Sequence, residues 1–165
     1  MFWHKWVVIA LLAGDKQKFG RSERFRAIPL TSGRLPSYCL QMDHSPGFLK
    51  LVDEAKRHVH EVTIDEARQR LEKNPQAVLM DVREESEWEK AHAVQAVHLG
   101  KGILERDLEQ MFPDPNREII MYCGGGYRSA LTAEAAQKMG YRNVHSLIGG
   151  YRGLVSAGWP MKSGS

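Results

Sequence analysis

Cysteine is scarce in this 165-residue sequence, which contains only Cys39 and Cys123. Two cysteines are too few for a disulfide framework or for a zinc site with four cysteine ligands. Long apolar runs are also absent, since none approaches the roughly 18 residues that predict a membrane-spanning helix. The sequence has no internal repeat and no low-complexity segment, so we expect a globular protein without a membrane span.

A strong charge of either sign is missing too, because 23 basic residues nearly balance 20 acidic ones and leave a net charge of +3. The small excess is local to residues 1–41, which contain seven basic and two acidic residues. The remaining 16 basic and 18 acidic residues make residues 42–165 slightly acidic. Residues 1–41 could act as a basic arm that binds nucleic acid, but residues 42–165 offer no basic patch to support such binding. We therefore expect no nucleic-acid partner.

Residues 1–41 combine an apolar run with basic residues in an order that fits an export signal only in part. The apolar run of residues 6–14 lacks the small residue that a cleavage site requires three positions before the cut, and basic residues follow it. We interpret residues 1–41 as a poorly ordered extension or as upstream sequence, and residues 42–165 as the functional domain. The expected location is therefore cytoplasmic, and export or an organelle is the alternative if residues 1–41 are a targeting segment. Cys39 is interpreted as an incidental thiol.

Short apolar runs alternate with amphipathic runs along residues 42–165, which predicts an α/β fold with a mainly parallel sheet flanked by helices. The strand-like runs are residues 62–64, 77–80, 96–99, 119–122 and 144–148. The predicted helices are residues 63–74, 84–90, 103–111, 129–139 and 151–157. Thr63 and Glu66 have the spacing of a capping box, and Gly140 suits the left-handed position after a helix end.

The segment YCGGGYR at residues 122–128 joins the most strand-like run to a helical one. In open α/β sheets, ligands bind beyond the carboxyl ends of the strands, so Cys123 lies where sites form. The three glycines allow backbone conformations that point several N–H groups at one centre. The start of the following helix adds a partial positive charge, and Arg128 adds a full one.

This environment predicts that Cys123 is a reactive nucleophile, because nearby N–H groups and cations stabilise a thiolate. The same groups are suited to hold the oxygens of an incoming oxyanion. The alternative is that Cys123 acts only as a small buried hydrophobic residue. This is the commoner role of a lone cysteine at a strand end. Three glycines, an arginine and a helix start within six residues favour the functional interpretation.

Several segments of the chain resemble those of rhodanese-type sulfurtransferase domains, and they occur in the same order. They are LMDVREESEW at residues 79–88, HAVQAVHL at 92–99, YCGGGYRSA at 122–130, KMGY at 138–141 and LIGGYRGLVSAGWP at 147–160. The resemblance covers roughly residues 58–161. It implies a three-layer α/β domain that transfers a sulfane sulfur through a cysteine persulfide, without a metal or an organic cofactor.

The resemblance assigns the role of catalytic nucleophile to Cys123. It assigns substrate binding to the loop that follows, residues Gly124, Gly125, Gly126, Tyr127 and Arg128. Asp81 and Arg83 match the family's Asp-Val-Arg at a strand end, and we interpret them as structural residues that support the site by ion pairing. His92 matches the histidine of the family's Gly-His-Ile-Pro-Gly motif and is interpreted as a hydrogen-bonded structural residue.

The chain departs from the family pattern in two places outside the cysteine loop. Ala91, Val94 and Gln95 stand where Gly, Pro and Gly are usual, and Leu154 stands where an aromatic residue is common. The cysteine loop itself has no basic residue besides Arg128, so we expect modest turnover of thiosulfate and consider another persulfide as the natural donor. The expected partners are a small-molecule sulfur donor, and a thiol or a protein cysteine as the acceptor.

Two other functions are alternatives to sulfur transfer. A cysteine phosphatase or arsenate reductase of similar fold has five residues between its cysteine and its arginine, whereas four residues separate Cys123 from Arg128. The shorter loop suits a single sulfur atom and is tight for a tetrahedral phosphate. The second alternative is a non-catalytic binding or redox-sensing module, although many modules of that kind lack the cysteine that this chain keeps.

Overall fold

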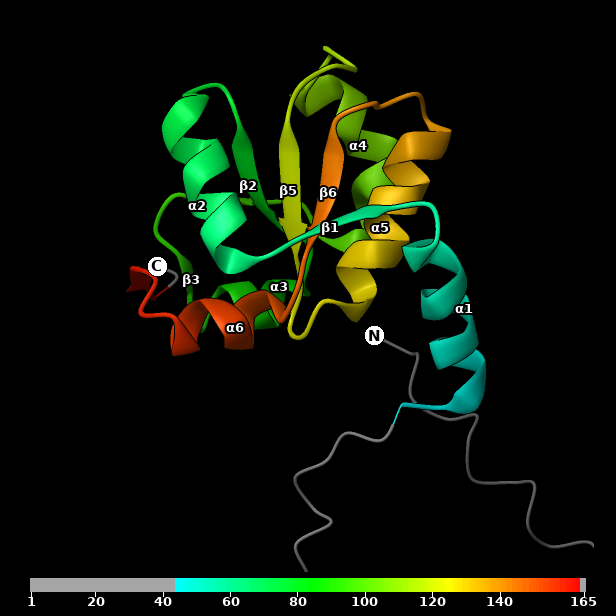
Figure 1. The fold of residues 1–165 in the computed structure, drawn as a ribbon, viewed down its shortest axis with the longest axis horizontal. Helices are drawn as coiled ribbons and strands as arrows, with labels where there is room; N and C mark the ends of the chain where they lie inside the picture. Colours follow the sequence, from blue (N-terminus) through cyan, green and yellow to red (C-terminus); the bar gives the residue numbers. More distant parts are fainter. Residues whose placement is uncertain (1–43, 164–165) are drawn as a thin grey trace, which may run out of the picture. The chain divides into compact units, whose positions relative to one another are not determined.

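A computed structural model describes residues 44–163 and confirms the predicted α/β class, with a central parallel sheet flanked by helices (Figure 1). The elements in chain order are α1 (Pro46–Lys56), β1 (His60–Val62), α2 (Ile64–Lys73), β2 (Val78–Asp81), α3 (Glu85–Trp88), β3 (His92–Ala93), β4 (Val97–His98), the 3-10 turn η2 (Lys101–Ile103), α4 (Leu104–Met111), β5 (Ile119–Tyr122), α5 (Tyr127–Lys138), β6 (Val144–Leu147), α6 (Gly150–Ser156) and β7 (Met161–Lys162). Five strands lie in the order β1-β6-β5-β2-β4, and all neighbours are parallel. The short strands β3 and β7 form a separate antiparallel pair.

The side chains of the central strands alternate between two apolar layers, one on each face of the sheet. On one face, Met80 of β2 and Met121 of β5 pack against α4 and α5. On the other face, Leu79 and Ile120 pack against α2 and α6. All four side chains are buried, which explains why these strands occur in the sequence as continuous apolar runs without polar alternation.

The parallel register brings the segments that follow three strands to one edge of the sheet. Asp81 at the end of β2 pairs with Tyr122 at the end of β5, and Met121 pairs with Ser146 of β6. The residues directly after β2, β5 and β6 therefore lie at the carboxyl edge, where sites form in sheets of this kind. Cys123 is one of these residues.

The helix ends follow the capping signals in the sequence. The predicted capping box is confirmed, because the Thr63 hydroxyl accepts from the Glu66 N–H at 3.3 Å and a Glu66 carboxylate oxygen accepts from the Thr63 N–H at 2.7 Å. Helix α2 ends at Lys73, one residue before its predicted end, and Asn74 is its C-cap. Gly140 has a φ of +103°, which confirms the left-handed residue predicted after α5.

Helix α5 begins at Tyr127, two residues before its predicted start at Ser129. The four-residue spacing of Leu131, Ala135 and Met139 predicted this helix, but these side chains are only partly buried. The fully buried face consists of small residues, Ser129, Ala130, Thr132, Ala133 and Ala136. Small side chains let the helix backbone lie close to the sheet, so the cysteine loop before α5 is held close to the end of β5.

Helix α1 and the pair of strands β3 and β7 have no counterpart among the predicted elements. Helix α1 is capped by Ser45, whose hydroxyl accepts from the Phe48 N–H at 3.3 Å, and it packs against α5. Strands β3 and β7 contain two residues each, which is too short for any periodic pattern. Their pairing is a consequence of tertiary packing and not of local sequence.

The interpretation of residues 1–41 as an extension, and of Cys39 as an incidental thiol, concerns residues outside the described range. Within residues 44–163, no helix is both long enough and apolar enough to cross a membrane. The expected cytoplasmic location stays a prediction.

Two histidines face each other across β1 and β6. The Nδ1 atoms of His60 and His145 lie 3.2 Å apart, and Nε2 of His145 donates to the side-chain oxygen of Asn143 at 3.0 Å. His145 is 8% exposed. Burial, together with the nearby positive charge of Arg70 and with His60, lowers the pKa of His145 to about 4.

We expect the free energy of unfolding to fall as the pH drops from 6.5 to 5. In this window His145 takes up a proton in the unfolded chain, where its pKa is near 6.5, but stays neutral in the folded protein. Stability that is present above pH 6.5 is therefore lost, on the order of 1 kcal/mol. Urea unfolding at a series of pH values measures this dependence.

The variant His145→Gln should flatten the pH dependence, whereas replacement of the exposed His58 by Gln should leave it in place. An unchanged slope in His145→Gln contradicts the assignment to this residue.

Candidate active site

Cys123 follows β5 directly, and three glycines carry the chain from it into α5. Its side chain is a free thiol that is 1% exposed, and its Sγ accepts a hydrogen bond from the backbone N–H of Gly126 at 3.2 Å. Gly126 has a φ of +93°, and a side chain there would come within 3.2 Å of the Leu147 carbonyl oxygen. Because α5 begins at Tyr127, the partial positive charge of its N-terminus lies at the same loop.

The first turn of α6 packs directly on the cysteine loop. Gly150 has a φ of +53°, and a Cβ at this position would overlap the carbonyl group of Cys123. The missing side chain lets the Tyr151 N–H donate to the Cys123 carbonyl at 2.6 Å and the Arg152 N–H donate to the Gly124 carbonyl at 3.3 Å. Two backbone hydrogen bonds thus hold the loop on α6.

A cavity of about 730 Å³ opens beside the cysteine loop. It is lined by His44, Ser45, Phe48, Arg83, Glu87, Cys123, Gly124, Gly125, Tyr127, Arg128, Tyr151 and Arg152. The rings of His44, Phe48 and Tyr127 pack on one another, with centroids 4.7 to 6.3 Å apart, and form one wall. Neither this cavity nor the rest of residues 44–163 contains three or more His, Cys, Asp or Glu side chains arranged to hold a metal ion.

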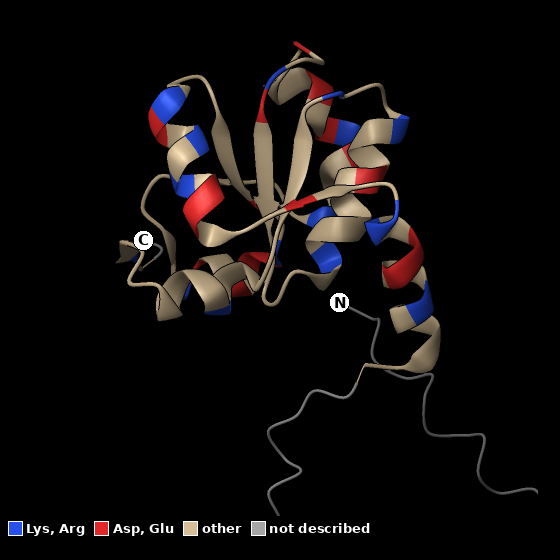
Figure 2. Cartoon of the chain, in the orientation of Figure 1, with Lys and Arg blue, Asp and Glu red and all other residues tan. Residues whose placement is uncertain are grey.

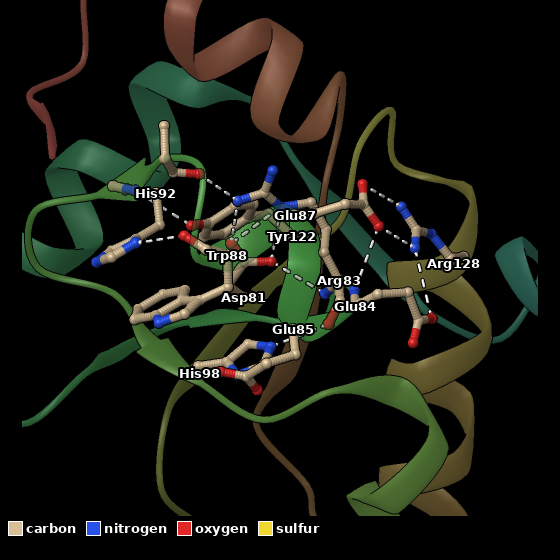
Figure 3. Close-up of polar contacts among 12 residues, drawn as sticks. Asp81, Arg83, Glu84, Glu85, Glu87, Trp88, His92, His98, Tyr122 and Arg128 are labelled. Atoms are coloured by element: carbon tan, nitrogen blue, oxygen red, sulfur yellow. Dashed lines mark hydrogen bonds and ion pairs between the residues drawn. The ribbon is translucent and has the colours of Figure 1, made fainter. Parts of the chain in front are cut away.

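The sequence predicts that the Arg128 side chain binds a ligand. In the structure its guanidinium is instead paired with a carboxylate of the short helix α3. It donates to both carboxylate oxygens of Glu87 at 2.7 and 2.9 Å (Figure 3), and Glu84 lies 3.7 Å away. The hydrogen bond from Arg128 is the main reason why the pKa of Glu87 is lowered. The charge of the Arg128 guanidinium is therefore compensated before any ligand arrives.

Asp81 and Arg83 form the ion pair that the sequence predicts. The Arg83 guanidinium makes three hydrogen bonds of 2.6 to 3.0 Å to the Asp81 carboxylate, and both side chains are buried (Figure 3). The guanidinium also donates to the Ala91 carbonyl at 2.7 Å and lies 4.2 Å from the ring centre of Tyr151. The pair connects the end of β2 to α6, and its supporting role in the site stays a prediction.

His92 is buried away from the residues that line the cavity. Its Nδ1 donates to the Trp88 carbonyl at 2.9 Å, which confirms the expected hydrogen-bonded histidine (Figure 3). The His92 ring stacks on the indole of Trp88 with centroids 3.4 Å apart, and Trp88 also stacks on His98 at 4.9 Å. Trp88 thus anchors α3, and with it Glu87.

Several residues that line the cavity have no role in the sequence analysis. Glu87 lies in the predicted helix at residues 84–90, which was given no role in the site. Arg152 stands in a segment that was predicted as a helix without a role in the site. His44 and Phe48 precede the part of the chain that resembles the family. No local signal connects these residues with Cys123, because only the packing of α1, α3 and α6 brings them there.

Residues 63–157 match the family model described as the rhodanese-like domain. A putative sulfur carrier protein, YrkF, from Bacillus subtilis is 30% identical over 94 residues, which cover 57% of this chain and 50% of the relative. The thiosulfate sulfurtransferase GlpE from Coxiella burnetii is 32% identical over 81 residues, covering 49% of this chain and 74% of the relative. The match with the first of these proteins therefore spans only half of that protein's length.

A solved structure from Rhodopseudomonas palustris is also similar to this chain. The TM-score is 0.65 at 26% identity, and the match covers 74% of this chain and 99% of the other. That protein is described as one of unknown function and a possible tyrosine phosphatase.

We expect Gly150→Ala to destabilise the protein by roughly 2 to 4 kcal/mol, because the new Cβ overlaps the Cys123 carbonyl and the left-handed backbone adds strain. Urea unfolding measures the change in the free energy of unfolding. Gly102→Ala is the matched control, since a Cβ at this position meets nothing within 4 Å and should change stability little. If Gly150→Ala is as stable as Gly102→Ala, the packing of α6 on the loop does not constrain the site.

Proposed function

The chain belongs to the rhodanese-like domain family, and from this premise we propose that it transfers a sulfane sulfur through a persulfide on Cys123. The names of two relatives, a sulfur carrier protein and a thiosulfate sulfurtransferase, support a role in sulfur transfer. The observation that carries the proposal is the hydrogen bond from the Gly126 N–H to Sγ of Cys123 at the start of a helix. A backbone donor at this atom stabilises negative charge on sulfur.

In the first step, the Cys123 thiolate attacks the outer sulfur of a donor such as thiosulfate. A new bond forms between Sγ and the outer sulfur, while the sulfur–sulfur bond of thiosulfate breaks. Sulfite leaves with the electron pair of that bond, and the enzyme carries the anionic persulfide. The backbone of Gly124, Gly125, Gly126, Tyr127 and Arg128 surrounds the added sulfur in this proposal.

In the second step, a thiophilic acceptor attacks the outer sulfur of the persulfide. Cyanide gives thiocyanate, and a thiolate or a protein cysteine gives a new persulfide, while Cys123 returns to the thiolate. No metal or organic cofactor takes part in either step, since the two sulfur displacements balance in atoms and charge. The proposed partners are therefore a small-molecule sulfur donor and a thiol or protein-cysteine acceptor.

We expect the intact protein to gain the mass of one sulfur atom after treatment with thiosulfate and to lose it again after cyanide or a thiol is added. Cys123→Ser should abolish the gain and leave the fold intact, because it removes the nucleophile and little volume. Cys39→Ser is the matched control and should retain the gain. Intact-mass analysis, with peptide mapping of the modified residue, measures each variant.

A wild-type protein that gains no sulfur, or a Cys123→Ser variant that still forms thiocyanate, contradicts the proposal. The first of these outcomes favours the non-catalytic binding module.

Phosphatase activity is the second candidate function, because the similar structure from Rhodopseudomonas palustris is described as a possible tyrosine phosphatase. We expect no hydrolysis of p-nitrophenyl phosphate above the buffer rate, since only four residues separate Cys123 from Arg128 and the Arg128 side chain is paired with Glu87. A colorimetric assay at several pH values measures this activity. Hydrolysis that Cys123→Ser abolishes would assign the site to phosphate chemistry instead.

A further inference from the structure

Two guanidinium groups lie beside the first two of the three glycines that follow Cys123. Nη2 of Arg128 is 3.4 Å from the position of a Cβ on Gly124, and the guanidinium of Arg152 occupies the space where a Cβ on Gly125 would lie. Both arginines line the same cavity as Cys123. Cationic groups from α5 and α6 therefore border the proposed nucleophile.

Two of the three arginines in this cavity are already paired with carboxylates. Arg128 makes two hydrogen bonds to Glu87, and Arg83 makes three to Asp81. A paired guanidinium adds little net attraction for an anion, because the carboxylate beside it repels the same anion. These two arginines hold the elements of the site in place.

Arg152 differs from both in having no such partner. It is exposed, and within the described part of the chain it forms no salt bridge. Helix α6 contains one basic and no acidic residue (Figure 2). The wall of the cavity formed by His44, Phe48 and Tyr127 is aromatic and has no carboxylate. Arg152 is therefore the cation of this cavity whose charge is available to an anionic reactant.

The backbone of Arg152 is fixed relative to the cysteine. Its N–H donates to the Gly124 carbonyl at 3.3 Å, and the preceding N–H, of Tyr151, donates to the Cys123 carbonyl at 2.6 Å. A side chain that starts from this position and lies over Gly125 approaches the cavity from a defined direction. The planar guanidinium presents several donors, which match the oxygens of a sulfonate or a carboxylate.

We propose that Arg152 on α6, and not the guanidinium of Arg128 in the cysteine loop, binds the anionic group of the incoming sulfur donor. With thiosulfate as donor, Arg152 binds the sulfonate oxygens and stabilises the charge that develops on sulfite as the sulfur–sulfur bond breaks. Arg128 is then a positioning residue that ties the loop to α3 through Glu87. The identity of the reactant rests on the proposed sulfur transfer, whereas the preference for anions does not.

The first test compares two alkylating reagents of nearly equal size, the anion iodoacetate and the neutral iodoacetamide. Both modify the Cys123 thiolate, so the ratio of their rates reports the attraction of the cavity for an anion and requires no sulfur transfer. Because Cys123 is 1% exposed, absolute rates depend on access, and the ratio cancels this factor. Mass analysis of the full chain measures modification at Cys123.

Arg152→Gln should lower the rate ratio of iodoacetate to iodoacetamide about tenfold, the size of one charge-assisted hydrogen bond. Arg152→Lys should retain most of the ratio. Arg142→Gln removes the same charge from an exposed residue before β6, at the other end of the sheet, and should leave the ratio unchanged. Arg128→Gln should change both rates together, because it releases the loop.

An Arg152→Gln variant with the wild-type ratio overturns the proposal. The proposal is also overturned if Arg128→Gln lowers the ratio of the two alkylation rates while Arg152→Gln keeps the wild-type ratio. That result would show that Arg128 binds the anion.

The second test displaces the Arg152 guanidinium without changing its charge. Gly125 does not have a left-handed backbone, so Gly125→Ala is tolerated there, and its Cβ pushes aside the end of the flexible Arg152 side chain. Gly125→Ala should lower the rate ratio in the wild-type background and leave it unchanged in the Arg152→Gln background. An equal loss in both backgrounds shows that Gly125 acts on its own and contradicts the proposal.

The third test applies if thiosulfate loads Cys123 with sulfur. Arg152→Gln should then raise KM for thiosulfate about tenfold, by the loss of one charge-assisted hydrogen bond. The rate at which cyanide removes the sulfur should fall less than KM rises, because cyanide is also an anion but has no sulfonate oxygens to accept from the guanidinium. If the wild-type protein gains no sulfur but the rate ratio still depends on Arg152, the proposed function fails and the anion site stands. An unchanged KM in Arg152→Gln overturns the assignment of the donor's anion to this residue.

Discussion

The packing of α6 on the cysteine loop is the constraint on which the candidate site depends. The contact requires a residue without a side chain at Gly150, where a Cβ would overlap the Cys123 carbonyl. It also requires the backbone hydrogen bonds from Tyr151 and Arg152 to the loop. With the carbonyl of Cys123 held on one side, its sulfur turns to the N–H of Gly126 and to the start of α5. One close backbone contact thus sets the position of the sulfur and of the Arg152 backbone.

Two of the three arginines in the site are paired with carboxylates and hold neighbouring elements in place. The pairs of Arg83 with Asp81 and of Arg128 with Glu87 connect β2, α3, α5 and the cavity wall through short hydrogen bonds. The desolvation of both charges offsets much of the stability that such a pair contributes, so its main effect here is to hold the two elements together. The guanidinium of Arg152 has no carboxylate partner among residues 44–163, so its charge acts on whatever enters the cavity.

Local patterns were sufficient for most of the elements. The apolar run at residues 119–122 became β5 with the predicted bounds, and the Thr63 capping box marked the start of α2. The start of α5 was placed two residues late, because its first turn is supported by the packing of the cysteine loop and not by an apolar stripe. The strands β3 and β7 were missed, since a two-residue strand pairs only when the surrounding fold brings its partner into place.

The nucleophile candidate and its glycines were evident in the sequence because they are consecutive residues between a strand and a helix. Their order in the chain already places a thiol, several N–H groups and a helix end within a few ångströms of one another. The partners of the arginines were not evident, because Glu87, Arg128 and Arg152 lie on three separate helices. The distances between these helices depend on how they pack on the sheet, and no short stretch of sequence encodes that packing. Local chain chemistry thus predicts which atom reacts, and long-range packing determines which charges surround it.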